Sequence, residues 1–314
     1  MHRYRHLIHF IVFIILVVLT FDINRNVITP MDTTNITETI NREDSLYNEI
    51  ETKAKHYEET PQDAYIDRVW KKTPGRNGRI VNIDKSYEKM KKEGVFKEAL
   101  LVYDEVPPKT DLKDLPPSPI YRGHPEKNMV AFLINVSWGE AYVPELLSTL
   151  KKHHVKATFF IEGKWAKNNA ELVKMIHEQG HLIGNHAYNH PDMSRLSNQN
   201  MVEQIVQTND IIKAIIGTTP KWFAPPSGSY NDHVVQVGHQ LNMETVLWTV
   251  DTIDWKNPSV SVMLNRVNEK LHPGATILMH PTEATARGLD QLITSIKDKK
   301  LKINTIEKLV DTQR

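Results

Sequence analysis

The chain has 314 residues, of which 40% are hydrophobic and 25% are charged, a composition typical of a globular protein. The formal net charge of +1, without a basic cluster, argues against a nucleic-acid partner, and the absence of cysteine excludes disulfides and thiolate chemistry. This length allows one large domain, or one large domain and one small domain.

The N-terminus predicts export from the cytoplasm. Arg3 and Arg5 precede an apolar run from Leu7 to Phe21, which is the pattern of a secretory signal. No cleavage site of small residues follows, and the run is shorter than the roughly 20 residues of a spanning helix. Residues 1–24 are therefore interpreted as an uncleaved signal-anchor or a signal peptide, with a buried N-terminal helix as the alternative. The rest of the chain is expected outside the cytoplasm, anchored to the membrane or secreted.

Two segments precede the main domain. Residues 25–60 are polar and predict a tether. Residues 61–119 predict a small α/β unit followed by a proline-rich connector. Within it we expect a strand over Arg79–Ile83, a helix over Asp84–Glu93 and a strand over Leu100–Tyr103.

Apolar strands alternate with amphipathic helices through residues 120–314. The expected strands are Met129–Ile134, Ala157–Ile161, His181–Gly184, Met243–Val250 and Ala275–Met279, and helices are expected around Val143–Leu150, Leu172–Ile176, Val202–Ile216, Val262–Leu271 and Glu283–Asp298. Such alternation indicates an α/β fold with a parallel sheet. Seven to eight units predict a distorted (β/α) barrel.

Two histidines follow the third strand at a spacing of four. His186 and His190 can thus share one face of a turn, and imidazole is a common ligand of divalent metals. The alternative is a pair of surface histidines on a polar loop. Polar or aromatic residues also follow the other strands: Asn135, Ser227, Asp251, Trp255 and His280. In parallel α/β barrels the carboxyl ends of the strands form the active site, so these side chains are expected at one face.

Five ordered segments resemble the polysaccharide deacetylase family, which is carbohydrate esterase family 4 or the NodB-homology domain. They are Lys156–Ile161, the metal motif from Gly184-Asn185-His186 to His190-Pro191-Asp192, Ala224–Gly228, Val250–Trp255 and Leu278-Met279-His280. Residues Asn135–Glu140 and the region before Met129 are most similar to the sporulation-associated branch. The resemblance covers about Met129 to Val310.

The resemblance implies a hydrolase that removes acetyl groups from N-acetylated glycan such as peptidoglycan. In the family, one Asp and two His hold a divalent metal, here expected to be zinc, that activates water. The residues that match are His186 and His190 for the metal, His280 for the general acid, Asp251 for the carboxylate that tunes it, Ser227 for the oxyanion site and Trp255 for the sugar pocket.

Three positions depart from the family pattern. Asn135 stands at the position of the base Asp, Val136 at the metal-binding Asp, and Ala224 at the Arg that holds the base. An amide cannot take a proton from water at neutral pH, and loss of a general base lowers the rate by ~10²–10⁴. Glu140 or Asp192 could supply a third metal ligand, and Glu140 or Asp254 could replace the base.

Two functions remain open at this point. The chain could be a metal-dependent deacetylase with a displaced base. Alternatively, it could be a pseudoenzyme of the same fold that binds glycan or a wall-assembly partner. A purely structural, wall-tethered protein and an enzyme that catalyses a different hydrolysis are further alternatives.

Overall fold

A computed structural model describes residues 45–314. The predicted anchor between Leu7 and Phe21 lies outside the described residues. Within residues 45–314, no helix is both long enough and apolar enough to span a membrane.

The chain divides into two compact units. Of the described residues, 45–58 and Ile80–Asp104 form one unit, and Glu59–Arg79 and Glu105–Arg314 form the other. This division differs from the predicted boundaries, because residues 59–79 and 105–119 group with the large domain instead of forming part of a separate small unit.

The smaller unit has its own hydrophobic cluster. Residues 45–54 are helical, although residues 25–60 were expected to form a tether. Leu46, Ile50 and Ala54 recur every four residues, so they share one face, and they pack with Met90 of helix α3 (Ile83–Met90). The expected strand Leu100–Tyr103 is instead a short 3₁₀ helix, Glu98–Leu100, followed by β4 (Tyr103–Val106).

Two short two-stranded sheets complete the N-terminal part. Strand β4 pairs with β3 (Gly78–Val81), and β1 (Tyr65–Asp67) pairs antiparallel with β2 (Lys71–Thr73). Side chains of residues 59–79 pack within the larger unit, as Ala64 does against Ile120 and Leu309 in one cluster.

The larger unit is built on a parallel sheet, as predicted. Its strands are β5 (Met129–Val136), β6 (Thr158–Ile161), β7 (Leu182–Asn185), β8 (Trp222–Phe223), β9 (Glu244–Thr245), β10 (Val250–Asp251), β11 (Thr276–Met279) and β12 (Lys302–Asn304). The order is β10-β11-β5-β6-β7-β8-β9, and β12 also pairs with β5. The curled sheet and its surrounding helices form a distorted (β/α) barrel, which confirms the predicted fold class.

The predicted strand Met243–Val250 is wrong. This segment contains two short strands, β9 and β10, that lie at the two opposite edges of the sheet. Residues 246–249 cross between these edges, and backbone hydrogen bonds tie the crossing to Ile120: Ile120 N donates to Thr245 O, and Leu247 N donates to Ile120 O. The apolar residues of this segment are buried in three different hydrophobic clusters, with Met243, Val246 and Val250 in one each, instead of forming one strand.

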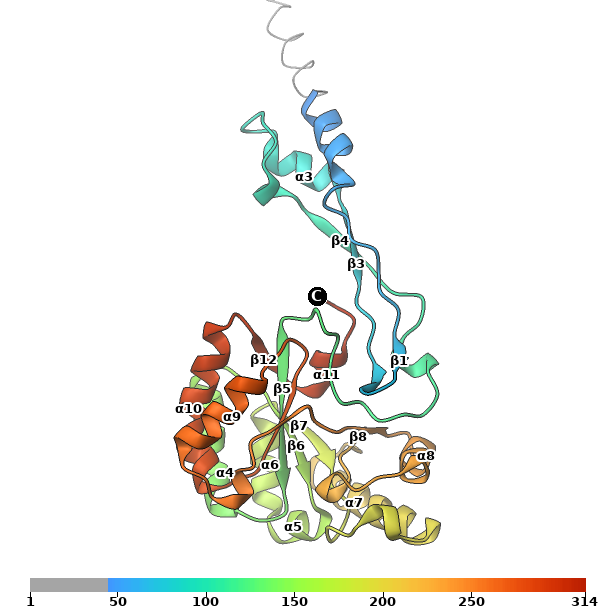
Figure 1. The fold of residues 1–314 in the computed structure, drawn as a ribbon, viewed down its shortest axis with the longest axis vertical. Helices are drawn as coiled ribbons and strands as arrows, with labels where there is room; N and C mark the ends of the chain where they lie inside the picture. Colours follow the sequence, from blue (N-terminus) through green and yellow to red (C-terminus); the bar gives the residue numbers. More distant parts are fainter. Residues whose placement is uncertain (1–44) are drawn as a thin grey trace, which may run out of the picture. The chain divides into compact units, whose positions relative to one another are not determined.

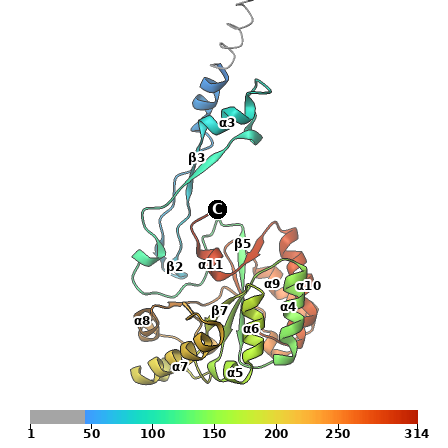
Figure 2. The ribbon, with the colours of Figure 1, turned by 180° about the vertical axis from the view of Figure 1, so that it is seen from behind.

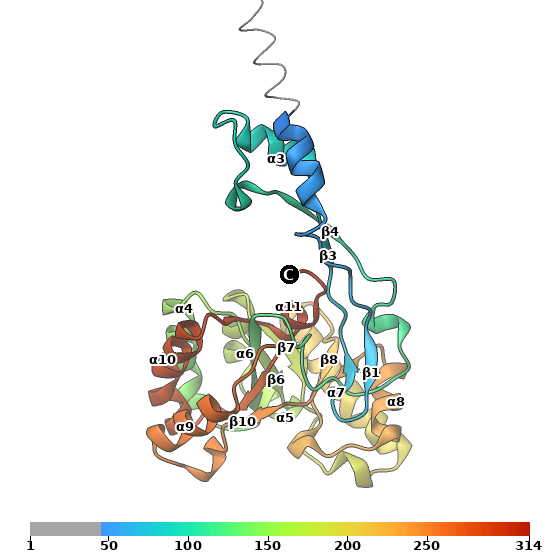
Figure 3. The ribbon, with the colours of Figure 1, turned by 45° about the horizontal axis from the view of Figure 1, so that its top comes forward.

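Helices follow the strands in the expected alternation (Figure 1). They are α4 (Val143–Lys152), α5 (Gly163–Asn168), α6 (Ala170–Glu178), α7 (Asn198–Ile216), α8 (Asp232–Gln240), α9 (Val260–Lys270), α10 (Glu283–Asp298) and α11 (Ile306–Val310). Helices α4, α6, α9 and α10 lie along one side of the strands (Figures 2 and 3).

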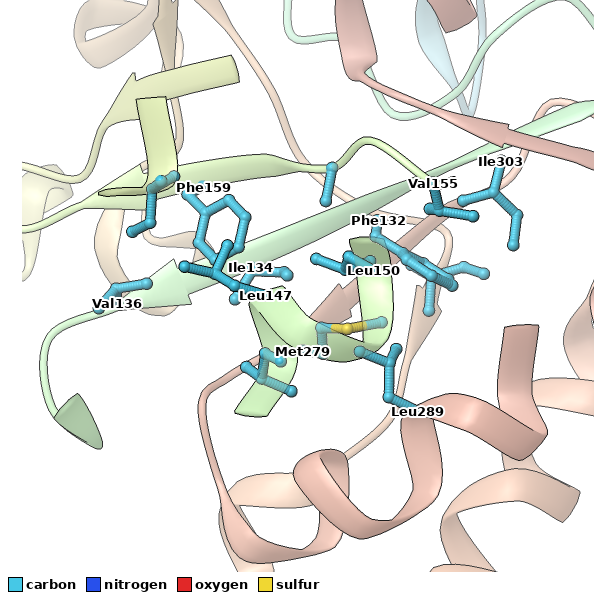
Figure 4. Close-up of a cluster of buried hydrophobic side chains, with 14 of the residues drawn as sticks. Phe132, Ile134, Val136, Leu147, Leu150, Val155, Phe159, Met279, Leu289 and Ile303 are labelled. Atoms are coloured by element: carbon cyan, nitrogen blue, oxygen red, sulfur yellow. The ribbon is translucent and has the colours of Figure 1, made fainter. Parts of the chain in front are cut away.

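The central strand β5 shows how the sequence separates core from site. Its side chains alternate between two faces because the strand period is two. Ile134 and Val136 pack with Leu147 of α4 and Leu289 of α10 in a cluster between the sheet and its helices, which we call the outer hydrophobic cluster (Figure 4). Ala131 and Leu133 point to the inner cluster instead. Asn135 therefore ends the inner face of the strand.

Candidate functional site

A cavity of about 400 Å³ opens at the carboxyl ends of the parallel strands. It is lined by Asn135, Trp138, His186, His190, Ser227, Trp248, Asp251, Trp255, Leu278 and His280. All seven site residues predicted from the sequence are in this set, although they come from widely separated segments. The structure thus brings them together, while the roles assigned to them stay predictions.

Asn135 lies at the last inward position of β5. It is only 3% exposed, and its amide oxygen has no hydrogen-bond partner within the part of the chain described. An unpaired buried acceptor costs about 1–3 kcal/mol relative to a paired one. Asn135 thus brings to the cavity wall a neutral side chain whose acceptor is unsatisfied.

His186 is held as a neutral imidazole. Its Nδ1 lies 2.7 Å from the backbone oxygen of Ala224, and because a carbonyl can only accept, Nδ1 is the protonated nitrogen. Burial, aided by the neighbouring His190, lowers the pKa of His186 to about 3. The rings of His186 and His190 stand edge to face with centroids 5.2 Å apart. The surface-loop alternative is excluded for His186, which is buried.

The metal-binding residues of the family are incomplete here. Catalytic zinc normally has three protein ligands, and within residues 45–314 no group of three His, Asp or Glu side chains is placed to hold a metal ion. Val136, at the position of the missing ligand, packs in the outer hydrophobic cluster. Asp192 pairs with Ser194, Ser229 and Arg195 instead. The residues present do not fit a catalytic metal with three protein ligands.

His280 is paired with Asp254, and the predicted pair with Asp251 is wrong. The distance from His280 Nδ1 to Asp254 Oδ1 is 2.8 Å. Asp251 lines the cavity but accepts a hydrogen bond from the backbone N–H of Ile253. Ile253 has a positive φ of 51°. This tight turn directs the carboxylate of the next residue, Asp254, to the imidazole.

Asp254 is fully buried and well satisfied. Its second oxygen accepts hydrogen bonds from His280 N at 2.7 Å and from the hydroxyls of Thr285 and Thr282 at 2.6 and 3.3 Å. Burial alone would raise the pKa of this carboxyl, but the His280 imidazole, with the other donors, lowers it below its ordinary value. An ionised Asp254 requires a proton on Nδ1 of His280, which leaves Nε2 as the nitrogen available to a ligand.

Neither proposed substitute base occupies the cavity. Asp254 is enclosed beneath His280, and Glu140 is exposed and lines a different cavity. The remaining carboxylate of the main cavity is Asp251, whose Oδ1 is engaged in the turn. Ser227 lines the wall from a backbone with a positive φ of 54°, within the 3₁₀ turn Pro226–Gly228.

Three tryptophans form much of the cavity wall. Trp138 stacks on His280 with ring centroids 5.1 Å apart and an interplanar angle of 17°. Trp138 and Trp255 are 43% and 49% exposed, so both present an aromatic surface to solvent. Gly139 positions this loop, because a Cβ there would lie 2.0 Å from Pro281 O. Tryptophan faces are suited to the apolar faces of sugar rings.

Sequence reasoning missed Trp138 and Trp248 as lining residues and Asp254 as the partner of His280. Trp138 follows the first strand just as Asn135 does, so its place near a strand end was a usable signal. Trp248 had none, because the segment that contains it was expected to be a strand.

Comparison with known proteins agrees with this geometry. Residues 122–246 match the family model described as polysaccharide deacetylase. The chain is 50% identical to the protein YlxY of Bacillus subtilis (strain 168), over 99% of each chain. It is 34% identical to a peptidoglycan-N-acetylglucosamine deacetylase of Bacillus cereus, over 55% of this chain and 65% of that protein.

Solved structures show the same similarity at the level of the fold. The crystal structure of BA3943, described as a CE4 family pseudoenzyme from Bacillus anthracis, has 50% identity and a TM-score of 0.83, and covers 86% of this chain and 96% of that chain. A mutant of BA3943 described as having restored enzymatic activity has 49% identity and a TM-score of 0.83, over 86% of this chain and 99% of that chain.

Proposed function

Because the chain belongs to carbohydrate esterase family 4, the polysaccharide deacetylases, we propose that it is a deacetylase-like pseudoenzyme that binds N-acetylated wall glycan and hydrolyses it slowly or not at all. The observation that carries this proposal is the neutral, unpaired Asn135 at the end of β5. The second support is that His186 and His190 match two metal ligands of the family, while residues 45–314 contain no group of three His, Asp or Glu side chains that could hold a metal ion.

The same residues that weaken catalysis favour binding. The amide oxygen of Asn135 can accept the N–H of an acetamido group, whereas an Asp in this place would act as a base. Trp138, Trp248 and Trp255 supply ring faces, and His280 Nε2 can meet a carbonyl or hydroxyl group. A bound N-acetylhexosamine would thus find hydrogen-bond partners and apolar contacts without a general base to activate water.

The test is to measure acetate release and binding on the same preparation. N-acetylglucosamine oligomers and peptidoglycan fragments are incubated with the protein, with and without added zinc, and affinity is measured by calorimetry. We expect binding with little or no acetate release under both conditions. Brisk release that depends on metal would refute the pseudoenzyme, and absence of binding would refute the glycan site.

A reverted variant tests whether the three departures explain the inactivity. Asn135→Asp, Val136→Asp and Ala224→Arg together should give measurable acetate release with zinc. Asn135→Asp alone should not, because the base would lack both metal and Arg. The BA3943 mutant with restored activity shows that a pseudoenzyme 49% identical to this chain can regain catalysis.

The location and timing of the protein are a further part of this proposal. We propose an extracytoplasmic position, anchored through Leu7–Phe21, and a role in the wall of a sporulating cell. Protease added to intact protoplasts should remove the C-terminal domain, whereas protection would contradict this topology. A deletion strain should be altered in spore wall glycan and not in vegetative growth; the reverse would contradict the sporulation role.

A further inference from the structure

A second cavity of about 410 Å³ lies beside the first. Its lining is strongly polar: Ser137, Glu140, Glu162, Lys164, Trp165, Asn168 and Asn169. Ser137 directly follows β5 and Glu162 directly follows β6, so this cavity also lies at the carboxyl ends of the strands.

The two cavities share backbone segments. Glu162 N donates to Val136 O at 3.0 Å, next to Asn135 of the first cavity. On the other side, Gly163 N donates to Ala187 O and Lys164 N to Tyr188 O, at 2.9 and 2.8 Å, within the loop that contains His186 and His190. The 135–140 loop contributes Trp138 to the first cavity and Ser137 and Glu140 to the second. One extended ligand could therefore contact both.

The second cavity holds polar groups that the protein leaves incompletely paired. Glu162 is 7% exposed and forms no salt bridge within residues 45–314. Burial raises the pKa of its carboxyl. The Ser137 hydroxyl and Lys164 act in the opposite direction but offset this rise only in part. Trp165 is 5% exposed, and its Nε1 donor has no partner in the described chain. Buried polar groups of folded proteins are normally paired.

The chemistry of these groups defines a ligand. The carboxylates of Glu162 and Glu140 outnumber the single ammonium of Lys164, so the cavity favours a cation. The amides of Asn168 and Asn169 and the indole N–H of Trp165 suit hydroxyl groups. A hydroxyl-rich ligand with a primary ammonium is an amino sugar without its acetyl group.

We propose that the second cavity binds a hexosamine unit with a free amino group, on the same glycan strand as the N-acetylated unit in the first cavity. The inference rests on the proposed glycan binding and extends it: the protein would recognise partially deacetylated glycan. Glu162 is then the residue that determines specificity for the free amine.

The experiment compares two soluble tetramers by calorimetry at about pH 6, where a primary amine is protonated. One is fully N-acetylated chitotetraose, and the other has alternating free and acetylated amines. The unmodified protein should bind the alternating tetramer roughly tenfold more tightly, the effect of one charge-assisted contact. Glu162→Gln should remove this preference and leave the affinity for the acetylated tetramer unchanged.

A matched control separates local recognition from net charge. Glu171→Gln makes the same chemical change at an exposed carboxylate of α6 that pairs with Lys174 and lines neither cavity, so it should keep the preference. Equal affinity of the unmodified protein for both tetramers would overturn the inference. An equal loss of affinity for both tetramers in Glu162→Gln would overturn it as well. If the acetylated tetramer fails to bind while the alternating one binds through Glu162, the proposed function fails and the inference stands.

Discussion

The imidazole of His280, which lines the main cavity, forms a buried pair with the carboxylate of Asp254, with 2.8 Å between Nδ1 and Oδ1. Asp254 lies beneath the imidazole, out of contact with the cavity, and accepts bonds from Thr282 and Thr285 as well. The pair fixes the orientation of His280 from behind, while Trp138 stacks against the ring.

Replacing this buried carboxylate should destabilise the fold. In Asp254→Asn the amide presents two N–H groups to sites occupied by donors, so we expect the free energy of unfolding to fall by about 2–4 kcal/mol in urea denaturation. Asp251→Asn is the matched control and should cost less than about 1 kcal/mol, because an Asn oxygen can still accept the Ile253 N–H. Equal losses in the two variants would contradict the assigned pairing.

Stability should fall as the pH falls below about 6.5, the pKa of histidine in an unfolded chain. Burial lowers the pKa of His186 to about 3, so between these values the unfolded chain binds a proton that the folded protein excludes. Between pH 7 and pH 5 this proton uptake lowers the free energy of unfolding by about 2 kcal/mol. Denaturation curves at pH 7 and pH 5 should give a smaller difference in the free energy of unfolding for His186→Asn than for the unmodified protein. The Asn amide can still donate to Ala224 O.

His181 provides an independent check of the same effect. Burial lowers its pKa to about 4, and it lies outside the main cavity. His181→Asn should therefore also reduce the loss of stability between pH 7 and pH 5. If neither variant changes the pH dependence, the titration of these buried imidazoles does not govern it.

A carboxylate at position 136 should make stability depend on zinc. Val136 is fully buried in an apolar cluster, so Val136→Asp without metal should lower the free energy of unfolding by about 2–4 kcal/mol. If the strand end can turn the side chain toward His186 and His190, added zinc should raise the melting temperature. Val136→Asp combined with His190→Ala should lose the zinc response, and a response that persists there would place the metal elsewhere.

The exposed indole of Trp138 should contribute to glycan binding and little to stability. Trp138→Ala should weaken binding of N-acetylated oligomers roughly tenfold, as expected for loss of one ring stack of about 1–1.5 kcal/mol. Tyr65→Ala, at an aromatic side chain that is similarly exposed (42%) but lies in β1, is the matched control and should have no effect. Unchanged affinity in Trp138→Ala would remove this residue from the site.

Strong periodicity made most of the barrel predictable. Helix α10 has the predicted bounds Glu283–Asp298, because its buried residues recur at helical spacing. Strand β5 begins at the predicted residue and extends two residues further, to Val136. The predicted site residues meet because the carboxyl ends of parallel strands share one edge.

The missed features depend on backbone turns and long-range pairing. Asp251 and Asp254 are chemically alike and close in sequence, and only the left-handed turn at Ile253 decides which one reaches His280. Likewise, an apolar segment from Met243 to Val250 has the composition of one buried strand. Its division between two sheet edges depends on pairing with β8 and β11, which lie far away in the sequence.

The crossing at residues 246–249 contains a side chain that affects the size of the ligand site but takes no part in strand pairing. Trp248 lies on this short link and lines the main cavity, while the strand pairs on either side do not include it. The backbones of Val246, Leu247 and Thr249 are hydrogen-bonded to Phe223, Ile120 and Thr276, so a change of length here would disturb the sheet. A change of the Trp248 side chain alone would widen the cavity and keep those bonds. Members of one fold family could in this way diverge in the glycan they accommodate, and a designer could vary this one position.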